Sequence, residues 1–315
     1  MSINVICATD NDFAPYCGVM LTSLFENNRK SKLSVFVLVD ESFSSRNQRK
    51  YLQLGTQYGQ TLHIVKVDSK QTADFPLNQS FCRISQPTYY RIMAARLLPH
   101  EVSKAIYLDC DIIVAGSLEP LWATDLEGKA IAGVKDGWMT FENNSYDHLQ
   151  YDRKYGYFNA GVVMLNLDYW RQIDIGTRLL DFIRSNRDNL PYMDQDALNG
   201  VLHEKTVWLP ERYNLQTKNL HKANWTDFPD HYQNTLMQEL PKAVIIHYCG
   251  KHKPWNYLYS GGPYHSLWDH YRHLSPYKCC RVRKPIVKYI KRRTKDFLFP
   301  SKREKRLADT WQIIV

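Results

Sequence analysis

The stretch Ile106-Tyr107-Leu108-Asp109-Cys110-Asp111-Ile112-Ile113-Val114 decides the fold of this chain. Its apolar residues predict a strand buried in a parallel sheet. Bare carboxylates are costly to bury, so Asp109 and Asp111 need a compensating partner, and a divalent cation is the obvious candidate. Residues two apart in a strand point to the same side. If the chain turns just after Asp111, both carboxylates can reach one ion at the carboxyl end of the strand, where open α/β sheets bind ligands.

An Asp-x-Asp pattern is weak evidence by itself, because the chain contains two others, Asp10-Asn11-Asp12 and Asp194-Gln195-Asp196. Solvated carboxylates at a strand end are the alternative interpretation. The apolar residues on both sides of Asp109 and Asp111 favour the cation.

The composition predicts a globular cytoplasmic protein. Of the 315 residues, 44% are hydrophobic and 13% aromatic, enough for a sizeable core. No segment approaches the ~20 apolar residues of a membrane-spanning helix. Residues 1–5 lack the basic start and the apolar stretch of a signal peptide. The seven cysteines are odd in number and scattered, which favours free thiols in a reducing compartment over a disulfide framework.

The net charge of +9 is concentrated at the carboxyl end. Residues 271–315 contain fourteen Lys and Arg against three acids, a balance of +11, so the other 270 residues sum to −2. We therefore expect a near-neutral globular domain over residues 1–270 and a basic tail over residues 271–315.

Apolar and basic residues of this tail fall on opposite sides of a helix. The pattern is typical of a helix on an anionic membrane surface, where each basic residue contributes about 1 kcal/mol. A solvated, partly disordered tail and a nucleic-acid-binding arm are the alternatives, and the apolar side disfavours nucleic acid because it has no use on a phosphate backbone. The apolar side comprises Ile286, Val287, Ile290, Phe297 and Leu298, and the basic side comprises Lys288, Lys291, Arg292 and Lys295.

Strand and helix patterns alternate along the globular part, which predicts a parallel α/β sheet. There is no Gly-x-Gly-x-x-Gly loop and no Walker lysine, so phosphates would need a metal or basic side chains. We expect strands at residues 3–9, 33–39, 62–67, 106–114, 130–134, 157–167 and 243–250, and helices at residues 16–25, 44–55 and 169–186.

Several polar residues between these elements are candidates for a site. Thr88 is a plausible helix cap with Arg91 one turn further on, although a solvated arginine is the simpler interpretation. Asp194 is a plausible cap of another helix, which would leave Gln195 and Asp196 unexplained. Residues 136–156 are polar and irregular and predict a flexible loop.

Two further signals flank late strands. Asn159 precedes Ala160-Gly161, whose small side chains would let a ligand approach the backbone closely. A tight turn before the strand is the alternative interpretation. His247 ends the last strong strand, and with Asp109 and Asp111 it would suit Mn²⁺ better than Ca²⁺ or a zinc–thiolate site.

Five motifs in a fixed order resemble glycosyltransferase family 8, in particular the bacterial lipopolysaccharide and lipooligosaccharide α-galactosyl- and glucosyltransferases. The resemblance runs from about residue 3 to residue 257. The motifs are Ala8-Thr9-Asp10-Asn11-Asp12-Phe13, Tyr107-Leu108-Asp109-Cys110-Asp111, Phe158-Asn159-Ala160-Gly161-Val162, Asp194-Gln195-Asp196-Ala197-Leu198-Asn199 and His247-Tyr248-Cys249-Gly250-x-x-Lys253-Pro254-Trp255.

The resemblance implies a GT-A fold, a UDP-galactose or UDP-glucose donor, Mn²⁺ or Mg²⁺ and retention of anomeric configuration. It also implies a lipopolysaccharide-type glycan acceptor, with Tyr192 on the acceptor side, and attachment of the tail to the cytoplasmic face of the inner membrane. Asp109, Asp111 and His247 would bind the metal. The donor would contact Ala8, Thr9, Asp10, Asp12, Phe13, Arg91, Cys110, Asn159, Ala160, Asp194, Gln195, Gly250 and Lys253.

The chemistry of sugar transfer suggests roles for the residues at 194–196. Negative charge grows on the leaving diphosphate, where a metal and Lys253 would stabilise it. The amide of Gln195 is a poor nucleophile, so we expect front-side attack by the acceptor, with the Gln195 carbonyl stabilising the sugar cation. Asp196 is the competing nucleophile. A nucleotide-sugar-binding protein without turnover and a phosphohydrolase acting on nucleotide sugars are the alternative functions.

Overall fold

The computed structural model describes residues 2–73, 75–77, 85–141, 146–250, 253–256, 262–279, 294–295, 297–301 and 304–305. The strands are β1 (Ile3–Ala8), β2 (Leu33–Val39), β3 (Thr61–Lys66), β4 (Lys104–Leu108), β5 (Ile112–Val114), β6 (Ile131–Lys135), β7 (Phe158–Asn166), β8 (Thr206–Trp208), β9 (Leu215–Gln216) and β10 (Ile245–His247). The α-helices are α1 (Ala14–Asn27), α2 (Ser45–Gln57), α3 (Ala94–Leu97), α4 (Glu119–Trp122), α5 (Gly137–Phe141), α6 (Leu167–Gln172), α7 (Ile175–Ser185), α8 (Asp194–Leu202), α9 (Lys222–Asp227), α10 (Asp230–Glu239) and α11 (His265–Leu274).

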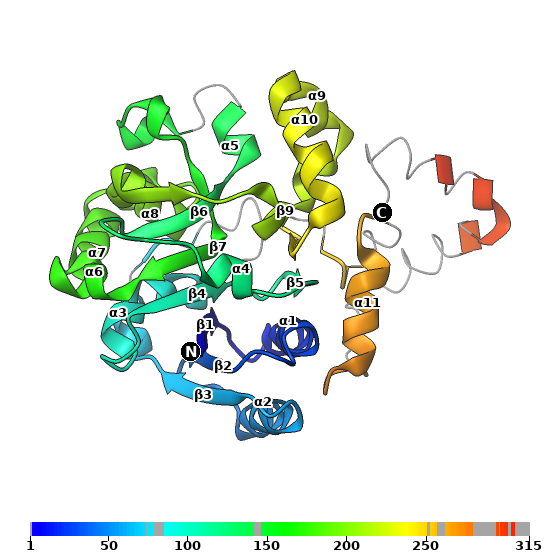
Figure 1. Cartoon of the computed structure of the whole chain (residues 1–315), viewed down its shortest axis with the longest axis horizontal. Coiled ribbons are helices and arrows are strands. Elements are labelled where there is room, and N and C mark those ends of the chain that lie inside the picture. The colour runs from blue at the N-terminus through cyan, green and yellow to red at the C-terminus, as the bar shows by residue number, and fades with distance from the viewer. Residues whose placement is uncertain are drawn as a thin grey trace.

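The expected α/β architecture with a mostly parallel central sheet is confirmed. Seven strands form this sheet in the order β3-β2-β1-β4-β7-β6-β8 (Figure 1). Only β7 among them runs antiparallel to its neighbours, β4 and β6, while the other pairs are parallel. A second sheet has the order β5-β10-β9.

Alternating side chains of the central strands build a core on each face of the sheet. In β1, Val5 and Cys7 pack in the cluster that contains α1 and α2, while Ile6 and Ala8 pack in the cluster that contains α3, α6, α7 and α8. Each fully buried aliphatic or aromatic side chain stabilises the fold by about 1.5–3 kcal/mol. This two-sided burial explains why the strands consist of continuous apolar runs.

The single strand expected over residues 106–114 is wrong, because the chain leaves the central sheet after Leu108 and joins the second sheet at Ile112. The residues Asp109 to Asp111 form the link between β4 and β5. The backbone N–H of Asp109 donates to the carbonyl of Gly161, and the N–H of Tyr248 donates to the carbonyl of Asp111, both at 2.9 Å. The link thus keeps backbone partners while its carboxylates turn toward a cavity.

The structure also differs from the prediction in two other segments. The helix expected over residues 169–186 is two helices, α6 and α7, because Asp174 adopts a left-handed conformation (φ 47°) and its side chain caps α7. The loop expected over residues 136–156 contains α5, which follows Asp136, and the Asp136 carboxylate accepts the N–H of Met139 at 3.2 Å. Residues 142–145 of that loop lie outside the described residues.

Neither predicted cap has that role. Thr88 lies inside a 3-10 helix, Gln86–Met93, that follows Ser85, and its hydroxyl donates to Asp194 instead. Helix α8 begins at Asp194 itself, so the N-cap position is occupied by Met193. Asp196 accepts the N–H of Tyr192 at 2.7 Å. Thr88 and Asp194 thus bond to each other across 106 positions of the chain, a contact that local sequence does not reveal.

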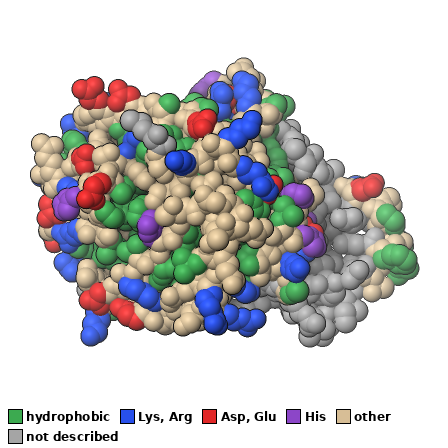
Figure 2. Space-filling view, turned by 60° about the horizontal axis from the view of Figure 1, so that its bottom comes forward, with side chains coloured by type: hydrophobic (Ala, Val, Ile, Leu, Met, Phe, Trp, Pro, Cys, Tyr) green, Lys and Arg blue, Asp and Glu red, His purple; other side chains and the backbone are tan. Residues whose placement is uncertain are grey.

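Helix α11 crosses residue 270, the domain boundary expected from the sequence. Tyr271 within α11 and Tyr277 beyond it are buried, and the Tyr277 ring occupies the space beside Gly18 of α1. The predicted tail residues Ile286, Val287, Ile290, Lys288, Lys291 and Arg292 lie outside the described residues, whereas Phe297 and Leu298 are 82% and 60% exposed. Figure 2 shows hydrophobic side chains at this end of the molecule. No helix in the described parts of the chain has the length and apolar character to cross a membrane.

Candidate active site

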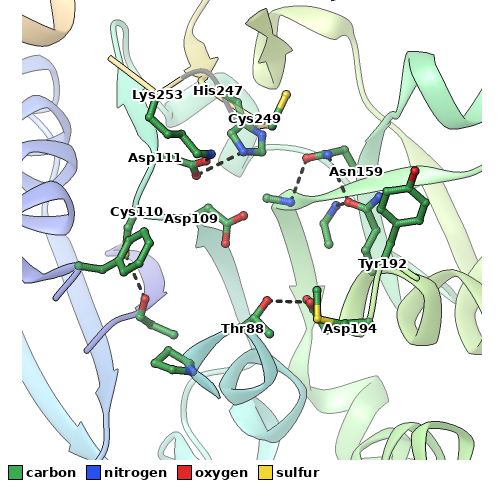
Figure 3. A pocket seen from close by; sticks show the side chains of 18 of the residues that line it. Thr88, Asp109, Cys110, Asp111, Asn159, Tyr192, Asp194, His247, Cys249 and Lys253 are labelled. Carbon is green, nitrogen blue, oxygen red and sulfur yellow. Dashed lines mark hydrogen bonds and ion pairs between the residues drawn. The ribbon is translucent and has the colours of Figure 1, made fainter. Parts of the chain in front are cut away.

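A cavity of about 730 Å³ lies between the carboxyl ends of β1 and β4, the start of β7 and the end of β10 (Figure 3). It collects almost all the site residues expected from the sequence, although they come from distant parts of the chain. Those that line it are Ala8, Thr9, Asp12, Phe13, Arg91, Asp109, Cys110, Asp111, Asn159, Ala160, Tyr192, Asp194, Gln195, His247, Gly250 and Lys253.

Asp109, Asp111 and His247 converge at one end of this cavity. Each offers one ligand atom, and these atoms lie within 4.8 Å of one another. His247 Nε2 is 3.3 Å from Asp111 Oδ1. An imidazole with two carboxylates is a donor set that suits Mn²⁺ or Mg²⁺. The space beside the triad depends on Gly161, since a Cβ there would lie 2.3 Å from His247 Cε1 and 2.9 Å from Asp109 Oδ2.

Lys253 supplies positive charge beside the triad. Its ammonium group forms an ion pair with Asp111 and donates to the carbonyl of Tyr248 at 2.8 Å. Burial by itself would raise the pKa of Asp111, but the ammonium group of Lys253 holds that pKa well below its usual range. Asp111 is therefore ionised at neutral pH and available as a ligand.

Arg91 is a buried bridge between two carboxylates rather than a solvated helix residue. It is 3% exposed, its Nη2 is 2.7 Å from Asp109 Oδ1, and its Nε is 3.0 Å from Asp194 Oδ2. Its guanidinium stacks 4.1 Å from the centre of the Tyr107 ring. Burial opposes its charge, but the two aspartates raise the pKa of Arg91 above its usual value, so it remains charged.

Asp194 faces the cavity from the start of α8. Its Oδ1 accepts the Thr88 hydroxyl at 2.7 Å (Figure 3). Its buried Oδ2 lies near Arg91 but accepts no hydrogen bond from the residues that the structure describes. Burial raises the pKa of Asp194 to about 6, although Arg91 and Thr88 pull it down. A hydroxyl-bearing ligand would satisfy the remaining oxygen.

Gln195 and Asn159 form the wall beside Asp194. The Gln195 carbonyl oxygen accepts the N–H of Ala160 at 3.0 Å and the amide of Asn159 at 3.2 Å. Both lone pairs of that oxygen are thus used within the protein, which gives no support to a direct contact between this oxygen and a sugar cation. The two bonds instead fix where the side chain stands.

The amino-terminal motif builds the opposite end of the cavity. Ala8, Thr9, Asp12 and Phe13 line it, and the Cys110 thiol donates to the carbonyl of Ala8 at 3.1 Å. Asp10 does not line the cavity, and its carboxylate accepts the N–H of Phe13 at 2.8 Å in the turn before α1.

Asp196 points away from the cavity into the protein. It is fully buried, and its carboxylate accepts the Tyr157 hydroxyl and the N–H of Tyr192, each at 2.7 Å. His148 Nε2 lies 3.4 Å from Oδ2 of the same carboxylate. The geometry therefore offers no route for Asp196 to reach a ligand in this cavity.

The same wall contains an ion pair between Lys218 and the buried Asp136 that was not predicted from the sequence. Lys218 Nζ is 2.7 and 2.8 Å from the two oxygens of Asp136, which also accepts the Asn159 amide at 3.0 Å. Asp136 follows strand β6 just as Asp109 follows β4, a signal that could have identified it. Nothing in the sequence around Lys218 marks its role. Trp138 and the Tyr16–Trp255 stack, with centroids 3.9 Å apart, also line the cavity.

Comparisons with known proteins agree with this arrangement. The profile of "Glycosyl transferase family 8" matches residues 4–259. The lipopolysaccharide 1,2-glucosyltransferase of Escherichia coli K12 is 28% identical over 257 residues, covering 81% of this chain and 73% of that protein. The lipopolysaccharide 1,3-galactosyltransferase of Salmonella typhimurium is 25% identical over 305 residues, covering 95% of this chain and 86% of that protein.

The solved structure of galactosyltransferase LgtC, in complex with donor and acceptor sugar analogs, superposes with a TM-score of 0.77 at 25% identity. The similarity covers 87% of this chain and 96% of that one. The family profile spans both sheets and all the motifs that build the cavity. The chain therefore belongs to glycosyltransferase family 8 and is an enzyme with the GT-A fold.

Proposed function

We propose that this glycosyltransferase moves a hexose, galactose or glucose, from a UDP-sugar to a glycan acceptor of the bacterial cell surface, with a divalent cation bound by Asp109, Asp111 and His247. The observation that carries the proposal is the convergence of this triad with Lys253 at one end of the cavity, beside the buried Arg91–Asp194 pair. Mn²⁺ or Mg²⁺ fits the donor set.

The diphosphate of the donor would lie beside the triad and Lys253, which already contact each other through Asp111. A bound divalent cation would neutralise the charge that grows on the leaving UDP. Lys253 already points its ammonium group into this region, where it can stabilise the same charge. Ala8, Thr9, Asp12 and Phe13 would then enclose the uridine at the other end of the cavity.

The hexose would lie against Arg91, Asn159, Ala160 and Asp194. The Asp194 oxygen without a hydrogen bond among the described residues is available to accept a sugar hydroxyl. We propose that the anomeric configuration is retained by front-side attack, because Gln195 is an amide and Asp196 is buried with its oxygens already bonded. In this proposal Gln195 and Asp194 shape the sugar site, while Asp196 holds the turn that carries them.

The acceptor would enter on the side of Tyr192, Trp138 and the Asp136–Lys218 pair, which the donor groups leave open. Aromatic rings and charged pairs are suited to the apolar faces and the hydroxyl groups of sugars. The names of the E. coli and Salmonella relatives support a lipopolysaccharide-type acceptor, either a free oligosaccharide or a lipid-linked glycan.

The basic tail would place the enzyme on a membrane. Its fourteen Lys and Arg residues favour an anionic surface, and the exposure of Phe297, Leu298 and Phe299 supports insertion of apolar side chains at the lipid boundary. We propose a peripheral position on the cytoplasmic face of the inner membrane and no binding of nucleic acid.

The test is UDP release by the purified protein with Mn²⁺ and a panel of UDP-sugars, with and without glucose-terminated and lactose-type acceptors and core oligosaccharide. We expect release with one donor that depends on an acceptor, and a product whose new linkage is α by NMR. UDP binding without turnover of any donor would favour a binding protein instead. Equal release without acceptor would favour a hydrolase of nucleotide sugars.

A further inference from the structure

Asn214 lies behind the cavity, between the triad and the sugar site. It follows the 3-10 helix Glu211–Tyr213 and precedes β9, and its side chain is fully buried. Its Oδ1 is 3.0 Å from His247 Nδ1, and its Nδ2 donates to Asn159 Oδ1 at 2.9 Å. Asn214 does not line the cavity, so any effect on the reaction must pass through these two neighbours.

We propose that Asn214 is a positioning residue that fixes the tautomer of His247, so that Nε2 presents its lone pair to the cation, and that ties this ligand to the sugar-binding wall. The inference deepens the proposed function at the same site and rests on it for the identity of the cation. The hydrogen-bond directions around Asn214 determine the tautomer whichever cation binds.

The direction of the chain of hydrogen bonds is set by one backbone group. The N–H of Gly161 donates to Asn159 Oδ1 at 3.0 Å, and a backbone N–H can only donate. Asn159 Oδ1 is therefore an acceptor, and the group of Asn214 that faces it must be the NH₂. The other end of the Asn214 amide is then its carbonyl oxygen, which faces His247 Nδ1.

A carbonyl oxygen facing Nδ1 requires a proton on that nitrogen. In a neutral imidazole the lone pair is then on Nε2, which is the nitrogen that faces Asp111 Oδ1 at 3.3 Å. A divalent cation held by both groups would remove the repulsion between these two acceptors. Asn214 thus selects the form of His247 that is ready to bind a metal, a role in which a partner on the distal ring nitrogen also fixes the ring plane.

The same amide couples the two halves of the site. Asn159, which accepts from Asn214, donates to Asp136 Oδ2 at 3.0 Å and to the Gln195 carbonyl at 3.2 Å. Loss of the Asn214 amide would leave Asn159 with one partner fewer and His247 free to rotate or change tautomer. We therefore expect both cation binding and donor binding to weaken.

The experiment measures the ring nitrogens of His247 by ¹⁵N NMR in metal-free, histidine-labelled protein at a pH where the ring is neutral, with the signal assigned by its loss in His247→Gln. We expect the proton on Nδ1 in the wild type and a mixture of tautomers in Asn214→Leu. Mn²⁺ titration should show affinity about 10–100-fold weaker in Asn214→Leu. Asn214→Asp keeps an acceptor for Nδ1 and should retain that tautomer even if donor binding weakens.

Asn28→Leu is the matched control, because Asn28 is also buried and its amide bonds three backbone groups, those of Leu24, Gly116 and Leu118, outside the cavity. It should leave the His247 tautomer and Mn²⁺ affinity unchanged. A proton on Nε2 of His247 in the wild type, or unchanged tautomer and affinity in Asn214→Leu, would overturn the inference. Failure of sugar transfer with the tautomer as expected would instead count against the proposed function alone, because the NMR measurement needs neither metal nor donor.

Discussion

Arg91 and Asp109 meet in the wall of the cavity, with Nη2 of the arginine 2.7 Å from Oδ1 of the aspartate. The same guanidinium lies 3.0 Å from Asp194 Oδ2. The buried guanidinium of Arg91 therefore connects Asp109 of the proposed metal triad with Asp194 of the proposed sugar site. Because Arg91 stays charged, the state of the sugar site depends on the protonation of Asp194.

The first prediction concerns pH. The pKa of Asp194 is raised to about 6, so this carboxyl is ionised above that pH and protonated below it. Only the ionised form has both oxygens free of protons to accept a sugar hydroxyl, and a charge-assisted bond of this kind contributes about 1.5–3 kcal/mol. The KM for the donor should therefore rise roughly tenfold as pH falls from about 7 to about 5.

Steady-state kinetics at saturating Mn²⁺ check this, with Asp194→Asn as the comparison. The variant should have a high KM that changes little over the same range. A wild-type KM that stays constant across this range would show that Asp194 does not bind the donor through its charge.

The second prediction concerns the space beside the triad. Gly161→Ala would place a methyl group 2.3 Å from His247 Cε1 and 2.9 Å from Asp109 Oδ2. Overpacking of this kind costs about 1–3 kcal/mol, and the ligands must move apart to relieve it. We expect the variant to fold but to bind Mn²⁺ at least about tenfold more weakly, as measured by isothermal titration calorimetry.

Gly116→Ala is the control, because it makes the same substitution at a glycine with room for a methyl group. The added Cβ would lie 3.5 Å from the nearest atom, a methyl of Val244, which is an ordinary contact. Its Mn²⁺ affinity should match that of the wild type. Equal affinity in Gly161→Ala would mean that the cation does not bind at this triad.

The third prediction separates two roles for Asp196. The buried carboxylate accepts the Tyr192 N–H beside Met193, whose backbone has φ of 50°. Asp196→Asn would replace one accepting oxygen by a donor, so we expect a loss of about 1–3 kcal/mol in the free energy of unfolding and lower turnover through displacement of Asp194. Mass spectrometry of protein incubated with donor alone should find no sugar on this residue.

A glycosyl adduct trapped on Asp196 in the wild type would contradict a positioning role and support the double-displacement alternative. Urea denaturation of the wild type and Asp196→Asn measures the difference in the free energy of unfolding independently of turnover.

The fourth prediction concerns the tail. A chain ending at Cys279 keeps Tyr271 and Tyr277 in the core. It lacks twelve of the fourteen basic residues of the tail, all except Arg272 and Lys278, and the apolar residues of the predicted helix. We expect it to turn over a soluble oligosaccharide acceptor normally but to lose sedimentation with vesicles containing anionic lipid. Equal vesicle binding by the truncated and full-length chains would place membrane attachment elsewhere or exclude it.

Sequence reasoning predicted most of the α/β order because the strands are two-sided core elements. Residues such as Val5, Ile6 and Cys7 are buried whichever face they point to, so their apolar run is visible without the structure. The five motifs likewise contain many of the residues that line the cavity, since each follows or opens an apolar strand or helix, although Asp10 and Asp196 do not line it.

The features that sequence reasoning missed depend on partners far along the chain. The break after Leu108 occurs because β5 pairs with β10, and Asp136 is satisfied by Lys218, which lies far along the chain. Asp194 resembles a capping residue locally, yet it bonds to Thr88, and Asp196, which capping leaves unexplained, bonds to Tyr157. Such choices are made by tertiary contacts, which a single sequence does not encode in any local pattern.

The most direct test of the central claim is the Mn²⁺ dependence of UDP release from the preferred donor, compared between the wild type, Asp109→Asn and the exposed control Asp188→Asn. Wild-type release should saturate with Mn²⁺, disappear with EDTA and return when Mn²⁺ is restored. Asp109→Asn should be slower by roughly 100-fold or more, while Asp188→Asn should match the wild type. Release that persists in EDTA, or in Asp109→Asn at the wild-type rate, would contradict a cation-dependent transfer site built on Asp109, Asp111 and His247.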